Sequence, residues 1–393
     1  MIDGDKRMNI VYVSACVSEA AYASLYGASK VKPAFQAQKY NRLFIEGLAH
    51  HTRVDVIGYP DAESSVRQER IVKLEPETVG NAHYHYLWGF RGPYRRLHLF
   101  WGTFFKSLRL LKGDSAVVVD CLNQMAGLGA LLAAKLRGKP CIGIVTDLPQ
   151  FIGGGAQFGV TNYLIRHCTG YVLLTEAMND LVNPSGKPYV VLEGHADAAI
   201  EQCRPSLERK GSKRVCLYAG SLSRIYGIEM LVEGFLLADL PDTELHIYGS
   251  GDYEQELKEI AKKHPNIVYG GLLLPGQVVE KEMEATLLVN PRPSGAEFVR
   301  YSFPSKTMEY MSTGTPVLMA KLPCLPKEYL PHLYLIEQET PEGMAQALRD
   351  TLAKDDETLF QKGVQARNFV LKERSNVIQA KKVLDMLERS QRK

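Results

Sequence analysis

The sequence predicts an α/β protein built from two doubly wound domains. Three observations lead to this class. Short β-branched runs alternate with amphipathic helical patterns along almost the whole chain, a rhythm typical of parallel sheets covered by helices on both faces. A polar, basic stretch at residues 195–213 interrupts the alternation, which restarts after it. The length of 393 residues is sufficient for two cores of ordinary size.

The first domain is predicted over residues 1–194. Amphipathic patterns at 38–51 and 125–138 predict helices that connect its strands. The β-branched runs that predict its strands lie at 9–15, 53–60, 115–120, 140–148, 170–176 and 188–194. Residues 195–213 are interpreted as the linker to the second domain.

The second domain is predicted over residues 214–360, and residues 361–393 are expected to form a last helix that packs back on the first domain. Helical patterns lie at 229–238, 253–264 and 344–355. The strand candidates lie at 215–221, 244–250, 266–270, 285–291, 316–320 and 333–337.

Composition narrows the class of protein. A hydrophobic content of 45%, with 23% charged residues, is typical of a soluble globular protein. The net charge of +3 gives no indication of nucleic-acid binding. The seven cysteines form no CxxC pair, and the start of the chain lacks the apolar core of a signal peptide. We therefore expect reduced thiols and a cytoplasmic protein, with peripheral attachment to the inner face of the membrane left open.

Residues 301–317, YSFPSKTMEYMSTGTPV, predict a short helix with an anion-binding entrance. Ser302 is expected to cap it, and Gly314 to end it in a left-handed conformation. Free N–H groups at a helix N-terminus favour phosphate. Glu309 lies roughly 7–10 Å further along the axis, on the face that carries Ser302 and Ser305, where it could accept from a ribose diol. The alternative is an ordinary buried helix with Glu309 in solvent.

Five segments of the second half follow one another at residues 218–235, 245–261, 266–274, 287–293 and 302–318. In this order and spacing they resemble the nucleotide-sugar domain of the GT-B glycosyltransferases, specifically glycosyltransferase family four in its bacterial capsule and exopolysaccharide branch. Two shorter segments of the first half, 143–149 and 190–197, resemble the same family more weakly. The resemblance implies two Rossmann-like domains facing a central cleft, with the acceptor on the first and the donor on the second.

The resemblance also implies roles for individual residues. Glu309 would hold the ribose, and the Ser302, Phe303 and Pro304 backbone would face the diphosphate. Gly220, Ser221 and Leu222 would form the opposite phosphate-side loop. Gly249 would make a tight turn near the donor.

Three positions depart from the family pattern. The first acid of its paired-glutamate motif falls at Tyr301, and Glu297 is the nearest carboxylate that could replace it. The usual arginine and lysine fall at Ser221 and Tyr226. The cation for the diphosphate is therefore expected from Arg224 or Lys306.

Asp147 ends a predicted strand, at the edge where ligands of α/β sheets bind. It resembles the family's catalytic-cleft residue near the acceptor, where it could orient or deprotonate the acceptor hydroxyl. A turn-capping role is the alternative. His195 is interpreted as a packing residue rather than a ligand. Loops 27–32 and 153–155 are left open between ligand contact and simple flexibility.

Residues 86–114 interleave eight large aromatic residues with six basic ones and contain both tryptophans. Such a segment suits the headgroup layer of an anionic membrane. A packing helix with solvated arginines is the alternative.

The expected function is a retaining hexosyl transfer from a nucleotide sugar, UDP favoured, to a lipid-linked saccharide during surface-polysaccharide assembly. No cofactor, metal ion or nucleic acid is expected. The alternatives are a GT-B sugar-nucleotide epimerase and a catalytically silent GT-B partner.

Overall fold

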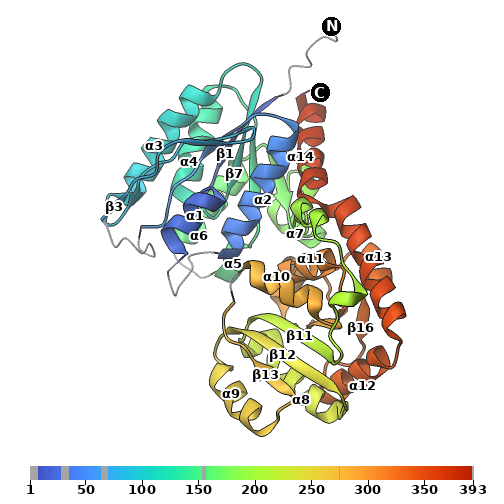
Figure 1. The fold of residues 1–393 in the computed structure, drawn as a ribbon. Coiled ribbons are helices and arrows are strands. Elements are labelled where there is room, and N and C mark those ends of the chain that lie inside the picture. The colour runs from blue at the N-terminus through green and yellow to red at the C-terminus, as the bar shows by residue number, and fades with distance from the viewer. Residues whose placement is uncertain (1–7, 28–34, 63–69, 153–155, 274, 392–393) are drawn as a thin grey trace. The chain divides into compact units, whose positions relative to one another are not determined.

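The computed structural model describes residues 8–27, 35–62, 70–152, 156–273 and 275–391. The chain divides into two compact units (Figure 1). The first comprises Met1–His195 and Ser375–Lys393, and the second Ala196–Arg374. Residues 28–32 and 153–155, for which ligand contact was considered, lie outside the described ranges.

The first unit is built on a sheet whose described strands run in the order β10-β9-β8-β7-β1-β2-β5-β4. All neighbours are parallel except β4 and β5. The strands are β1 (Asn9–Val13), β2 (Val54–Ile57), β4 (Glu77–Val79), β5 (Ala82–Tyr84), β7 (Ser115–Asp120), β8 (Cys141–Val145), β9 (Gly170–Leu173) and β10 (Tyr189–Val191). The pair β3 (Ile71–Val72) and β6 (Gly89–Phe90) forms a separate antiparallel ribbon.

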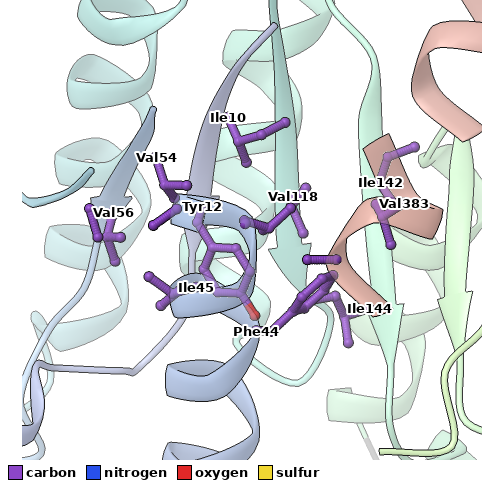
Figure 2. Close-up of a cluster of buried hydrophobic side chains, with 14 of the residues drawn as sticks. Ile10, Tyr12, Phe44, Ile45, Val54, Val56, Val118, Ile142, Ile144 and Val383 are labelled. Atoms are coloured by element: carbon purple, nitrogen blue, oxygen red, sulfur yellow. The ribbon is translucent and has the colours of Figure 1, made fainter. Parts of the chain in front are cut away.

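Helices of the first unit connect these strands. They are α1 (Glu19–Tyr26), α2 (Phe35–His51), α3 (Arg95–Leu110), α4 (Gln124–Leu136), α5 (Pro149–Ile152), α6 (Ala156–His167), α7 (Glu176–Val182) and, from the chain end, α14 (Asn376–Gln391). One face of the sheet packs against α2 and α14. Figure 2 shows side chains from both helices, Phe44 and Val383, meeting strand residues such as Tyr12, Val118 and Ile144.

The chain end is held on the first unit by close contact between α14 and α2, which run side by side in Figure 1. A Cβ on Gly47 would lie 2.2 Å from the carbonyl oxygen of Asn376, so this crossing requires glycine. Asn376 donates to the Leu43 carbonyl at 3.1 Å, and Gln379 donates to the Gly194 carbonyl at 3.1 Å. The helical region after residue 361 breaks at Ser375, which separates α13 in the second unit from α14 in the first.

The second unit is built on a parallel sheet in the order β13-β12-β11-β14-β15-β16. The chain proceeds outward from β11 to β13 and then returns to the other side of β11 with β14. The edge between β11 and β14 is therefore the topological switch point, where open α/β sheets bind ligands. The strands are β11 (Arg214–Ser221), β12 (Thr243–Ser250), β13 (Ile267–Tyr269), β14 (Leu287–Asn290), β15 (Val317–Ala320) and β16 (Tyr334–Ile336).

Separate cores cover the two faces of this sheet. One is formed with α8 and α12, and the other with α11 and α13. The α-helices of the unit are α8 (Ile228–Ala238), α9 (Glu254–Lys263), α10 (Pro275–Glu284), α11 (Ser305–Thr313), α12 (Pro341–Leu352) and α13 (Asp356–Arg374). Its 3₁₀ turns are η1 (Ala198–Gln202), η2 (Leu207–Arg209), η3 (Arg224–Tyr226), η4 (Glu297–Tyr301) and η5 (Lys327–His332).

Residues 195–213 were interpreted from the sequence as a linker; His195 belongs to the first unit, and residues 196–213 lie in the second unit and are hydrogen-bonded to it. Arg367 of α13 donates to the carbonyls of Ile200 and Cys203 at 2.7 and 2.9 Å. Lys210 donates to the Met283 carbonyl at 2.7 Å, and burial lowers its pKa to about 8.

The predicted fold class, two doubly wound α/β domains, is confirmed. Within the described ranges, every helix is too short or too polar to cross a membrane.

Candidate functional site

The ends of two neighbouring strands of the second unit, β11 and β12, approach each other closely at a pair of glycines. Gly249 of β12 has φ +139°, and a Cβ on it would lie 1.7 Å from the carbonyl oxygen of Gly220 on β11. Only glycine can occupy this position. The Leu222 amide donates to the Ser250 carbonyl at 2.9 Å, which fastens the next turn as well. This contact therefore fixes the loop after β11 at the switch point.

Lys306 of α11 lies across Gly220. A Cβ on Gly220 would be 2.2 Å from Lys306 Cε and 3.0 Å from its Nζ, so the lysine occupies the space that a larger residue would fill. No carboxylate of the described residues pairs with Lys306. Its ammonium lies 5.8 Å from the ring of Tyr310, whose hydroxyl accepts from the Ala219 amide at 2.9 Å. The helix is thus anchored to β11 with an uncompensated cation at the end of the strand.

The entrance of α11 differs from the sequence prediction at one residue. Ser302 does not cap the helix, because it ends the 3₁₀ turn η4 with an extended backbone at φ −131° and ψ 108°. The helix begins at Ser305 with Pro304 in the cap position and no side-chain cap. The prediction for Gly314 is confirmed, since it ends α11 at φ +81°.

The other residues predicted to contact the donor differ in how far their side chains are exposed. Phe303 is buried and its ring lies 5.5 Å from that of Tyr329, so at this position the backbone is what a ligand could contact. Leu222 is buried in the same way, whereas Ser221 is exposed at the end of β11. Glu309 is half-buried, one turn beyond Lys306.

The two candidates for the missing family acid lie on opposite ends of η4. Glu297 is its exposed first residue, and Tyr301 is its half-buried last residue.

Arg224 and Lys306 differ in their partners. Arg224 forms ion pairs with Glu229 of α8 at 2.5 Å and with Glu256 of α9, and these carboxylates raise the pKa of its guanidinium. Its guanidinium also lies 4.8 Å from the ring of Tyr253. The charge of Arg224 is therefore compensated within the protein, and that of Lys306 is not.

Arg292 is a residue that the sequence analysis did not single out. It lies two residues after the end of β14 and is only 7% exposed, and its Nε has no hydrogen-bond partner in the described structure. The one available signal was its place after a predicted strand, in the segment LLVNPRP.

Asp147 of the first unit follows β8 with an accessible side chain. Partial desolvation by its surroundings raises the pKa of its carboxyl above the ordinary value. An elevated pKa suits a group that exchanges a proton with a hydroxyl.

A second carboxylate, Asp120, ends the neighbouring strand β7 and was also missed. It is buried, and it accepts from the Leu122 amide at 3.0 Å, from Asn123 Nδ2 at 2.7 Å and from Asn41 Nδ2 at 3.3 Å. Burial raises the pKa of Asp120 to about 6, and the charge of Asp147 adds to this shift. Because β7 adjoins β1, where the strand order of the first unit reverses, Asp120 lies at the switch point of that sheet.

His195 has a packing environment. Its ring stacks on Phe44 at 5.1 Å and lies 4.6 Å from Tyr40, and neither nitrogen has a hydrogen-bond partner in the described structure. Burial lowers its pKa to about 3, which keeps it neutral at physiological pH.

Comparisons with known proteins define the class. Residues 213–354 match the family model described as Glycosyl transferases group 1. A search of curated proteins found no match. Among solved structures, sucrose-phosphate synthase (tll1590) from Thermosynechococcus elongatus superposes with a TM-score of 0.69 at 15% identity, covering 98% of this chain and 100% of that one.

Two further solved structures are similar over the whole chain. Alr3699/HepE of Anabaena, in complex with UDP and glucose, has a TM-score of 0.61 at 14% identity and covers 97% of this chain and 100% of its own. The lipopolysaccharide outer core galactosyltransferase WaaB in its apo form has a TM-score of 0.61 at 14% identity, with 98% and 100% covered. The chain has the GT-B fold, its second unit carries a group 1 glycosyltransferase domain, and the protein is a glycosyltransferase.

The raised pKa of Asp120 predicts a specific dependence of stability on pH. Its stabilising contribution is complete below the ordinary carboxyl value of 3.8 and is lost as the pH rises through about 6. The free energy of unfolding of the wild type, relative to Asp120→Asn, should therefore fall between pH 4 and pH 6, by at most about 1.4 kcal/mol per pH unit.

Urea unfolding followed by tryptophan fluorescence measures this difference. The fluorescence reports on the first unit, which contains Asp120, because both tryptophans, Trp88 and Trp101, lie there. Asp180→Asn, at an exposed position of α7, is the matched control. A wild-type-to-Asp120→Asn difference that stays constant from pH 4 to pH 7 would contradict the raised pKa.

Proposed function

We propose that this protein is a retaining, metal-independent glycosyltransferase of family four that moves a sugar from a UDP-sugar to a lipid-linked saccharide in bacterial surface-polysaccharide assembly. The observation that carries the donor assignment is the position of Lys306. Its ammonium has no carboxylate partner among the described residues and lies over Gly220, next to the last residue of β11, at the switch point of the sheet. Lys306 belongs to the first turn of a helix without a side-chain cap. Such an arrangement favours a diphosphate.

The reaction places charge where this arrangement can stabilise it. The bond between the anomeric carbon and a diphosphate oxygen breaks, and the diphosphate leaves with the electron pair. The acceptor oxygen forms the new bond on the same face and loses its proton. Lys306 and the N–H groups of α11 would stabilise the negative charge of the leaving group, which is commonly the largest contribution to such catalysis.

Glu309 would hold the ribose of the donor, further along α11 from the diphosphate. Two ribose hydroxyls donating to one carboxylate make charge-assisted hydrogen bonds. Asp147 would accept the hydroxyl proton of an acceptor bound to the first unit.

Different observations support UDP as the nucleotide of the donor and a mechanism without a metal ion. The Anabaena HepE structure, which has the same fold, was solved with UDP and glucose. Lys306 could neutralise part of the diphosphate charge that a metal ion neutralises in other transferases. In the described part of the chain, no three His, Cys, Asp or Glu side chains gather as a metal-binding group.

The exposed face of α3 supports contact with an anionic membrane. Leu99, Thr103, Phe104 and Ser107 form the buried face of this helix, and α3 packs against α4. A second apolar stripe, Leu97, Trp101 and Phe105, recurs every four residues and is 56%, 47% and 62% exposed. Arg96 and Arg109 are exposed on the same helix, which contains no acidic residue.

A packing helix would need only one apolar face, so the second stripe favours the membrane interpretation of residues 86–114. Aromatic residues flanked by arginines suit the headgroup layer. Peripheral docking would bring the enzyme to a lipid-linked acceptor.

Replacing Lys306 should separate the two candidate cations. We expect Lys306→Gln to lower kcat about 100-fold or more, because the leaving group loses a preorganised positive charge. Arg224→Gln should lose far less, since two carboxylates already compensate that residue. The measurement is UDP release with and without a lipid-linked acceptor, which also distinguishes a transferase from an epimerase.

Lys262→Gln, at an exposed position of α9, serves as the control for this series. Equal losses in Lys306→Gln and Lys262→Gln would contradict the role of Lys306.

Charge reversal on α3 should weaken membrane binding. Each basic residue near an anionic surface contributes about 1 kcal/mol, so Arg96→Glu with Arg109→Glu should reduce the partition coefficient by at least about 30-fold at low salt. Co-sedimentation with phosphatidylglycerol vesicles measures it.

The matched control reverses Lys262 and Lys263 on α9, which are equally exposed on a helix of the second unit. Equal sedimentation of wild type, α3 variant and α9 variant would exclude α3 as the docking face.

A further inference from the structure

Arg292 is a buried guanidinium without an anionic partner. The described residues offer it no ion pair, and its Nε lies buried with no hydrogen bond. Burial lowers the pKa of this arginine, and no carboxylate acts against that effect. Unpaired buried charge costs several kcal/mol of desolvation in proteins, so residues in this state commonly serve a function.

Two aromatic rings near Arg292 account for only part of its environment. The guanidinium carbon lies 5.1 Å from the ring centre of Phe298 and 5.9 Å from that of Tyr226. Such contacts stabilise a cation by about 0.5–2 kcal/mol. They cannot accept the planar set of N–H donors that makes arginine suited to phosphate.

The backbone places Arg292 at the switch point that Lys306 marks. Leu217 of β11 and Leu288 of β14 are register partners. The same offset carried three residues further makes Pro291, the first residue after β14, the counterpart of Gly220. Arg292 therefore follows the residue that corresponds to the glycine under Lys306.

Neighbouring segments fix this position from two sides. A Cβ on Gly227 would lie 2.1 Å from the carbonyl oxygen of Pro291, so the loop after β11 is pressed against the loop after β14. On the other side, Asn290 Nδ2 donates to Thr307 Oγ1 in the first turn of α11 at 3.4 Å. Arg292 therefore lies between the two elements expected to contact the donor phosphates.

We propose that Arg292 binds the pyrophosphate of the nucleotide-sugar donor and, together with Lys306, compensates the charge of the departing nucleoside diphosphate. This inference rests on the proposed transferase function. It also accounts for the uncharged residues Ser221 and Tyr226 in the loop after β11, because the second cation comes from the loop after β14. Binding of the anion supplies the partner that the guanidinium lacks in the free protein.

Calorimetric titration of the free protein tests the proposal. UDP, GDP, ADP and CDP are first titrated into the wild type, and the tightest binder is then compared with its nucleoside. We expect Arg292→Met to weaken the nucleoside diphosphate about 10- to 100-fold, the effect of losing a hydrogen bond to a charged group, and to leave the nucleoside unchanged. Arg349→Gln, at an exposed position of α12, is the control.

Thermal unfolding of the free protein distinguishes a ligand-binding role of Arg292 from a structural role. Because Arg292 is unpaired, Arg292→Met should melt at the wild-type temperature or above it. A lower melting temperature together with weaker nucleoside binding would show a structural role and overturn the proposal.

The remaining outcomes separate this inference from the proposed function. Unchanged diphosphate affinity in Arg292→Met would overturn the role of Arg292 and leave the transferase proposal intact. A loss seen only with UDP-glucuronate, and not with UDP or UDP-glucose, would place Arg292 at a sugar carboxylate and overturn the pyrophosphate assignment. A wild type that binds none of the four diphosphates would overturn both proposals.

Discussion

The ligand-binding edge expected in the second unit depends on the contact between Gly220 and Gly249. The two strand ends approach so closely that a single methyl group on Gly249 would lie 1.7 Å from the Gly220 carbonyl oxygen. The absence of both side chains lets the ends of β11 and β12 approach this closely, beside the switch point between β11 and β14. Lys306 then occupies the space above Gly220, so the same constraint that shapes the backbone also places a cation at the strand end.

Three basic residues surround this edge, and their charge compensation assigns them different roles. Arg224 is neutralised by Glu229 and Glu256 and holds η3 against α8 and α9. Lys306 and Arg292 have no carboxylate partner among the described residues, and only Arg292 is buried. A binding site for a diphosphate needs cations whose charge is not already compensated by a carboxylate. Lys306 and Arg292 meet this requirement, and Arg224 does not.

The fold could be predicted from the sequence because parallel strands and amphipathic helices leave a strong periodic signal. Asp147 could be chosen because it ends a predicted strand, and Gly220 because its segment resembles the nucleotide-sugar domain. Asp120 also ends a predicted strand, but its burial and its contact with the distant Asn41 cannot be seen in the sequence. The burial of Arg292 is hidden in the same way. Ser302 was wrongly expected to cap α11, because a 3₁₀ turn over Glu297–Tyr301 extends the backbone before the helix begins.

Hydrogen exchange of backbone amides, with and without UDP, would show whether a nucleoside diphosphate binds at the switch point of the second unit. When UDP is bound, we expect slower exchange in three segments: the amides of residues 219–224, those of Asn290 and Arg292, and those of the first turn of α11. The second unit also contains a hollow lined by β16 and α12, including Glu337, Gln346 and Lys354. Protection confined to that hollow, with unchanged exchange at the three segments, would contradict a donor site at the switch point.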